Sequence, residues 1–130
     1  MARALAYLGN LYGDFGNYEQ AKNLLEQSLM IYKKYFPEEH TKRALVLMHL
    51  GNVYRDLGNY QKSKDLLEGS LLIYKEHFPK AHVDVARAST YLANIYTLLG
   101  KYERSKYLLE QGISIYKNIL QKTMWKLLGF

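Results

Sequence analysis

Apolar and polar positions alternate along the chain with the spacing of a helix, and the whole pattern occurs three times. In the first copy, apolar or small residues follow one another at intervals of three, one and three, which places them on one stripe of a helix. These are Leu5, Leu8, Gly9 and Tyr12. The pattern recurs with a period of 42 residues, which is typical of a repeat array and predicts three copies of one structural unit.

Each copy is predicted to contain two helices joined by a short turn. The first helices should cover residues 2–14, 41–56 and 83–98, and the second helices residues 18–35, 60–77 and 102 onward. Gly16, Gly58 and Gly100 mark the turns, because glycine tolerates the left-handed conformation that often ends a helix. Turns this short require antiparallel pairs. Phe36-Pro37 and Phe78-Pro79 should end the second helices, since the residue before proline avoids helical geometry.

The third copy has Gln121 where the second has Pro79, so its last helix should continue to about Leu128. The apolar residues of this extension, 121–130, are Met124, Trp125, Leu127, Leu128 and Phe130. We expect them to cap the end of the stack, because terminal repeats need a cap. Alternatively, Met124–Phe130 contacts a neighbouring repeat or a second copy of the protein and forms a homo-oligomer.

Composition limits the classes of function. The 130 residues, 48% of them hydrophobic, fit one globular domain. The absence of cysteine excludes a disulfide scaffold and favours a reducing, cytoplasmic location. No apolar run is long enough to span a membrane, and residues 1–8 match the repeat rather than a signal peptide. A formal net charge of +6 is compatible with acidic partners, although a solvated surface of mixed charge is the favoured explanation.

No motif for catalysis, metal binding or cofactor binding is present. The histidines lack the paired spacing of metal sites, and no phosphate-binding loop occurs. They are His40, His49, His77 and His82. His40 and His82 share a linker position, so we expect a local role such as capping. The sequence therefore predicts a protein that is not an enzyme and has no catalytic residues, metal or cofactor.

The repeated residues resemble the tetratricopeptide repeat, whose helix pair carries a large residue, Leu-Gly, Tyr, Gly-x-Tyr, and then small, large and small residues. In the second copy these are Leu47, Leu50-Gly51, Tyr54, Gly58-x-Tyr60, Ser63, Leu67 and Ser70. The third copy departs from the pattern at Ser89 and Ala93. The 42-residue period and the Phe-Pro-x-x-His linkers are most similar to the kinesin-light-chain type, while Leu-Gly-Asn-x-Tyr is also similar to the Pins-type adaptors.

The resemblance implies an all-α solenoid of three helix-turn-helix repeats with a C-terminal helical extension as cap. The repeats are residues 2–36, 41–78 and 83–120 of the 1–120 region, followed by 121–130. In the family, the first helices line a concave groove that receives a peptide. The implied function is a non-enzymatic scaffold or adaptor that binds a peptide or partner helix.

One column of the projected groove consists of Asn10, Asn52 and Asn94. An amide both donates and accepts hydrogen bonds, so three amides at one-repeat spacing could bind the backbone of an extended peptide. Similar asparagines bind peptides in relatives. The alternative is that each asparagine bonds a neighbouring helix and sets the repeat geometry.

Further projected groove residues are Met48, His49, Arg55, Arg87, Thr90 and Tyr91. Arg55 and Arg87 could form forked hydrogen bonds to carboxylates, so an acidic or C-terminal segment is the expected ligand. The alternatives are surface charge for the arginines and interhelical packing for His49 and Tyr91. Two other functions stay open: self-assembly through the C-terminal tail, and weak nucleic-acid binding by the basic surface. The latter is less favoured because most lysines fall on the second helices.

Overall fold

The computed structural model describes residues 1–78 and 82–129, and within these ranges it contains six helices and no strand. They are α1 (Ala2–Asp14), α2 (Tyr18–Tyr35), α3 (His40–Asp56), α4 (Tyr60–His77), α5 (Val83–Leu98) and α6 (Tyr102–Leu128). The all-α repeat fold is confirmed, and of the expected helix boundaries only the start of α3 differs, by one residue. Pro79, the predicted stop after α4, lies outside the described residues.

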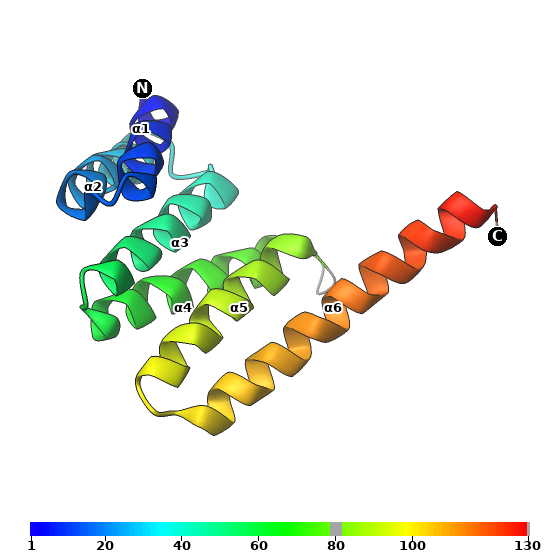
Figure 1. The fold of residues 1–130 in the computed structure, drawn as a ribbon. Helices are drawn as coiled ribbons and strands as arrows, with labels where there is room; N and C mark the ends of the chain where they lie inside the picture. Colours follow the sequence, from blue (N-terminus) through cyan, green and yellow to red (C-terminus); the bar gives the residue numbers. More distant parts are fainter. Residues whose placement is uncertain (79–81, 130) are drawn as a thin grey trace.

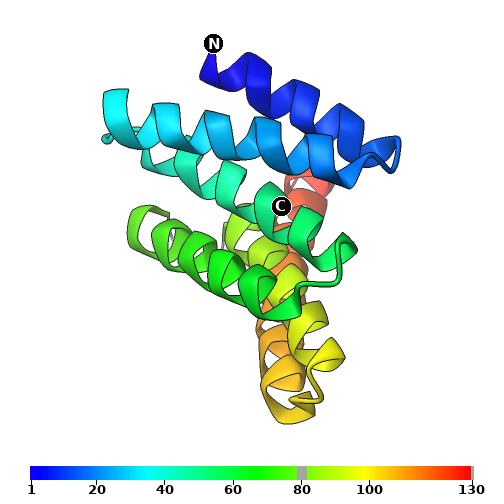
Figure 2. The ribbon, with the colours of Figure 1, turned by 90° about the vertical axis from the view of Figure 1, so that its left-hand side faces the viewer.

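Three helical hairpins, α1/α2, α3/α4 and α5/α6, are stacked in chain order (Figures 1 and 2). The second helix of one hairpin packs on the first helix of the next, as α2 does on α3 and α4 on α5. In addition, α1 contacts α3 and α3 contacts α5, whereas the described parts of α2, α4 and α6 make no such contacts with one another. The first helices therefore approach each other more closely than the second helices do. Their side of the stack, formed by α1, α3 and α5, is called the inner face below.

The turns between paired helices are identical in the three hairpins. Gly16, Gly58 and Gly100 have φ of 83°, 86° and 77°, where a residue with a Cβ atom would be strained. The residue after each glycine donates its backbone N–H to a carbonyl five residues back, as Asn17 does to Tyr12 at 2.9 Å. This pattern satisfies the last carbonyls of the first helix and sends the chain back along it.

The two helices of a hairpin pack closely because glycine faces leucine at their contact. A Cβ atom on Gly51 would lie 2.8 Å from Cγ of Leu67, and one on Gly9 would lie 3.0 Å from Cγ of Leu25. The third hairpin has Ala93 at this position. A larger residue fits there because Leu109, the counterpart of Leu67, is 40% exposed and free to move.

Buried serines join the two helices by hydrogen bonds at the other end of the first two hairpins. Ser28 donates its hydroxyl to the Ala2 carbonyl, and Ser70 donates to the Ala44 carbonyl, each at 2.7 Å. A helix carbonyl normally accepts from its own helix, so the serine adds a second bond that joins the two helices. The small residues of the repeat pattern thus allow close packing and also make polar contacts.

A tyrosine–glutamate hydrogen bond connects successive hairpins. Tyr54 on α3 donates to Glu26 on α2, and Tyr96 on α5 donates to Glu68 on α4, both at 2.5 Å. Burial and the bond to Glu26 raise the pKa of Tyr54 to about 12, and burial and the bond to Glu68 raise the pKa of Tyr96. Both phenols are therefore protonated donors at neutral pH, and the same bond is made at both junctions.

The two linker histidines, His40 and His82, make different local contacts. His82 precedes α5 and accepts a hydrogen bond from the backbone N–H of Asp84 at 3.0 Å, so it caps the helix as expected. His40 is the first residue of α3, and its ring stacks on that of His77 with centroids 4.1 Å apart. The shared linker position therefore has two local roles rather than one.

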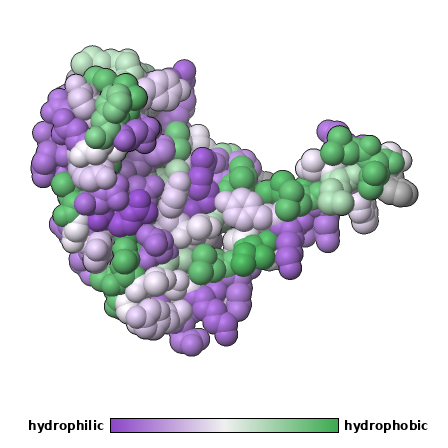
Figure 3. Space-filling view, in the orientation of Figure 1, coloured by the Kyte–Doolittle hydropathy of each residue, from purple (hydrophilic) through white to green (hydrophobic). Residues whose placement is uncertain are grey.

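The C-terminal extension is helical, as predicted, but its expected capping role is wrong. Helix α6 contacts α5 alone among the described helices, and its last turns project away from the stack (Figures 1 and 3). Its large apolar side chains from residue 120 to 128 are 56–81% exposed. No proline or glycine lies between Gly112 and Gly129, so the last turns of the helix continue without a kink and do not fold back over the end. Phe130 lies outside the described residues.

Replacing Gly51 by alanine tests the close contact in the second hairpin. We expect Gly51→Ala to lower the free energy of unfolding by about 1–3 kcal/mol, because the fully buried Leu67 cannot move away from the new methyl group. Gly13→Ala is the matched control, since its Cβ would lie 3.8 Å from the nearest atom, Cβ of Ala21. It should raise the free energy of unfolding by up to about 1 kcal/mol. Urea denaturation measures both, and equal effects would contradict this account.

Candidate functional site

The inner face carries the predicted asparagine column in the same register on successive first helices. Asn10 on α1 and Asn52 on α3 are half-buried, and Asn94 on α5 is exposed. The Asn52 amide oxygen is buried and has no hydrogen-bond partner among the described residues. The Asn94 oxygen accepts a long bond of 3.4 Å from Arg55. That bond joins α3 to α5, so one member of the column does contribute to repeat geometry.

Both predicted arginines lie beside an aspartate. Arg55 contacts Asp56 at 3.4 Å, and Arg87 forms an ion pair with Asp84 one helical turn before it. The Nε atom of Arg87 is buried without a partner among the described residues. Each positive charge is therefore offset locally, but both guanidinium groups keep N–H donors that their aspartates do not use.

His49 sits between charged residues of the neighbouring inner helices. Burial lowers its pKa most, the positive charge of Arg87 on α5 lowers it further, and Asp14 on α1 raises it. The imidazole is therefore neutral at neutral pH and can both donate and accept a hydrogen bond. Tyr91, the counterpart of His49 on α5, is half-buried and packs against the core. This contact agrees with the alternative that Tyr91 serves interhelical packing.

Two predicted groove residues face the partner helix of their own hairpin. Met48 is completely buried in the core between α3, α4 and α5. Thr90 donates to the Ala86 carbonyl at 2.9 Å, and its oxygen would lie 3.4 Å from a Cβ atom on Gly112 of α6. Thr90 thus supplies the hydroxyl that serine supplies in the first two hairpins, because Gly112 replaces that serine. Met48 therefore offers no surface to a ligand, whereas the groove role of the half-buried Thr90 stays a prediction.

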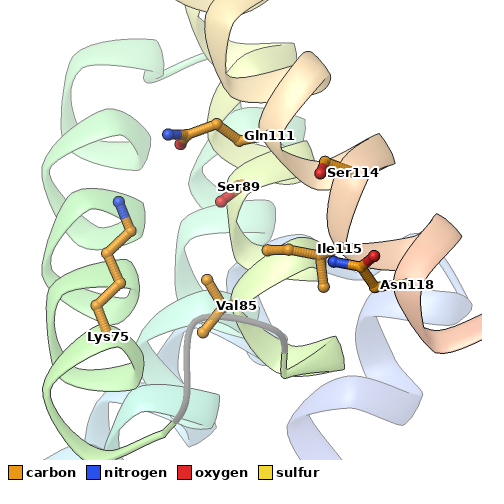
Figure 4. Close-up of a pocket in the computed structure, with 7 residues that line it drawn as sticks. All are labelled: Lys75, Val85, Ser89, Gln111, Ser114, Ile115 and Asn118. Atoms are coloured by element: carbon orange, nitrogen blue, oxygen red, sulfur yellow. The ribbon is translucent and has the colours of Figure 1, made fainter. Parts of the chain in front are cut away.

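The structure also contains a cavity of about 470 Å³ that the sequence did not indicate, between α4, α5 and α6 (Figure 4). Its lining residues are Lys75, Val85, Ser89, Gln111, Ser114, Ile115 and Asn118. In the second hairpin the position of Ser89 is held by Leu47, whose Cδ1 lies 4.0 Å from a Cβ atom built on Gly69. The serine is too short to fill this space. In the sequence, only the departure of Ser89 from the repeat pattern could have indicated this cavity.

The described residues contain neither a metal-binding cluster nor a membrane-spanning helix. In residues 1–78 and 82–129, no three histidine, aspartate or glutamate side chains lie close enough to hold a metal ion. Over the same ranges, none of the helices combines the length and the apolar character needed to cross a membrane.

Comparison with family models gives matches along most of the chain. A model of the tetratricopeptide repeat matches residues 42–118, and a second model of this repeat matches residues 1–41. A search of curated protein sequences found no match.

Solved structures share the fold. A Podosopora anserina protein described as a kinesin light chain with nearly identical TPR-like repeats is 28% identical, with a TM-score of 0.79. That match covers 87% of this chain and 54% of the other, so the chain spans about half that protein's length. The TPR domain of Arabidopsis FLU has a TM-score of 0.78 at 17% identity, covering 90% of this chain and 95% of that domain. BtubC from P. vanneervenii has a TM-score of 0.76 at 20% identity, and the match covers 88% of this chain and 45% of that one. The last two matches concern the fold alone.

The neutral state of His49 predicts a pH dependence of stability. In the unfolded chain His49 takes up a proton at a pKa of about 6.5, whereas in the folded protein its pKa is lower. The unfolded state therefore binds more protons at acidic pH, and the free energy of unfolding should fall as pH drops below about 6.5. One proton limits the loss to about 1.4 kcal/mol per pH unit. His49→Gln should remove this part of the slope. Urea midpoints at pH 7.5 and 5.5 measure it, and identical slopes in both proteins would show that His49 is not held neutral.

Proposed function

Because the chain belongs to the tetratricopeptide-repeat family, we propose that it is a non-enzymatic scaffold that binds an extended segment of another protein along its inner face. Repeats of this family generally mediate protein–protein interaction, and the kinesin-light-chain type predicted from the 42-residue period is confirmed. We place the protein in the cytoplasm, since a chain without cysteine suits a reducing compartment.

The observation that carries this proposal is unused hydrogen-bonding capacity on adjacent inner helices. Asn52 on α3 has an unpaired acceptor, its amide oxygen, and Arg87 on α5 has an unpaired donor, its Nε–H. A buried polar atom without a partner costs about 1–3 kcal/mol, so a ligand that satisfies it gains that energy. A peptide group offers one donor and one acceptor, which is the complementary pair. Side-chain rotation on binding, which is common at interfaces, would bring both atoms to the surface.

The arginines support a preference for acidic segments. A carboxylate on the ligand could take the N–H groups of Arg55 and Arg87 that Asp56 and Asp84 leave unused. Because each aspartate already offsets one positive charge, the preference should be moderate. Asn94 is exposed beside Arg55 and extends the same polar strip along α5.

Removing the amides tests the binding surface. Peptides selected from a phage-displayed random library on the wild-type protein should bind the Asn52→Ala/Asn94→Ala variant at least about tenfold more weakly, a loss of about 1.4 kcal/mol. Helicity and the melting temperature should stay nearly unchanged. The matched control is Asn23→Ala/Gln27→Ala, which removes two exposed amides from α2. Undiminished binding to the inner-face variant would refute the proposed site.

Removing the arginine charges tests the ligand class. The same selection should enrich peptides in aspartate and glutamate, and Arg55→Gln/Arg87→Gln should weaken their binding about three- to tenfold at low salt. The difference from wild type should shrink as salt rises, because partly exposed charges are screened. Isothermal titration calorimetry at two salt concentrations measures this. Equal affinity for acidic peptides and their amidated versions would exclude the acidic preference while leaving the surface itself intact.

A further inference from the structure

The C-terminal end of the stack exposes a surface that is buried at both internal junctions. On α2 and α4, three positions belong to a core cluster shared with the next hairpin and are at most 9% exposed: Leu25, Leu29 and Tyr32, and Leu67, Leu71 and Tyr74. Their counterparts on α6 are 37–52% exposed. These residues, Leu109, Ile113 and Tyr116, are called the C-terminal face.

The N-terminal end exposes the complementary surface. On α3 and α5, the residues that pack against the preceding hairpin are at most 6% exposed: Leu50, Val53, Leu92 and Ile95. The counterparts on α1 are Leu8 and Leu11, which are 43% and 48% exposed. Phe15, which follows α1 on the same side, is also exposed. Leu8, Leu11 and Phe15 are called the N-terminal face.

The two faces also carry the two halves of the tyrosine–glutamate bond. At each internal junction a tyrosine of the first helix donates to a glutamate of the preceding second helix. At the same repeat positions, Tyr12 lies on α1 and Glu110 lies on α6. The ends thus present a matched donor and acceptor beside matched apolar surfaces.

We propose that the chain associates head to tail, with the C-terminal face of one copy packed against the N-terminal face of a second copy. The contact would repeat the α2/α3 and α4/α5 junctions, with Tyr12 of one copy donating to Glu110 of the other. A second copy is the occupant because this chain holds both halves of an interface that it already makes twice internally. Pairing of identical faces is disfavoured, since two C-terminal faces would bring the Glu110 carboxylates of both copies together.

A head-to-tail interface leaves one unused face at each end of the assembly, so it does not close at a dimer. Successive hairpins are rotated relative to one another (Figure 2), and an assembly that continues this rotation grows as an open stack. Its mass should therefore rise steadily with protein concentration. Residues 121–128 have no counterpart in α2 or α4 and lie outside the proposed contact.

Sedimentation velocity from micromolar to submillimolar concentration tests the proposal. Wild-type protein should form a concentration-dependent series of oligomers. Leu11→Asp blocks the N-terminal face and Ile113→Asp blocks the C-terminal face, so each variant alone should be monomeric. An equimolar mixture should form a dimer and nothing larger, because each variant keeps one intact face. Tyr12→Phe should weaken association about ten- to a hundredfold, as expected for one hydrogen bond to a carboxylate.

Two controls complete the design. Met30→Asp places the same charge on an exposed residue of α2 away from both faces and should leave association unchanged. Removing residues 121–130 should also leave it unchanged, whereas loss of association would assign self-assembly to the tail and overturn the proposal. A wild-type protein that stays monomeric, or a single variant that still dimerises, would overturn it too. Circular dichroism confirms that each variant is folded. Because both faces are separate from the inner face, the peptide-binding proposal is decided independently.

Discussion

The close contact between the two helices of each hairpin is the constraint on which the other features depend. At Gly9 and Gly51 there is no space for a methyl group, so the helices meet at backbone distance and their relative rotation is fixed. That rotation determines which residues of the first helix face the partner helix and which remain on the inner face. Repeating it every 42 residues aligns Asn10, Asn52 and Asn94 on successive helices. The candidate binding surface therefore follows from a packing requirement elsewhere in the repeat.

The junctions between hairpins combine a non-directional and a directional interaction. Leucine and tyrosine side chains bury apolar surface there, which supplies most of the free energy but tolerates sliding. The bonds from Tyr54 to Glu26 and from Tyr96 to Glu68 have a fixed length and direction, so they select one register. In the proposed head-to-tail contact the same two interactions would act together: apolar residues alone would aggregate without order, whereas Tyr12 and Glu110 would define how a second copy docks.

The sequence was sufficient for the helices because its signals are local. The turn glycines and the repeat period determine boundaries almost residue by residue. Side-chain direction was harder to predict: neighbouring positions on a helix point about 100° apart, so an error in projecting the groove was enough to include the fully buried Met48. The extension beyond Leu120 shows a related limit. Helical spacing of apolar residues predicts that a helix continues, but it contains no information on whether the helix turns back over the stack.

The third hairpin differs from the second by smaller residues on both of its helices. Ser89, Gly112 and Ser114 are smaller than the residues at the same positions of the second repeat, and α6 has three buried residues where α4 has five. In a stack where each hairpin is stabilised only by its neighbours, such a terminal unit gains most from a further neighbour. Head-to-tail docking would provide one, and it would also place Asn10 of the next copy one repeat beyond Asn94. The inner faces would then form one longer polar column, so a segment spanning two copies would bind with the higher effective concentration of a second site on the same surface.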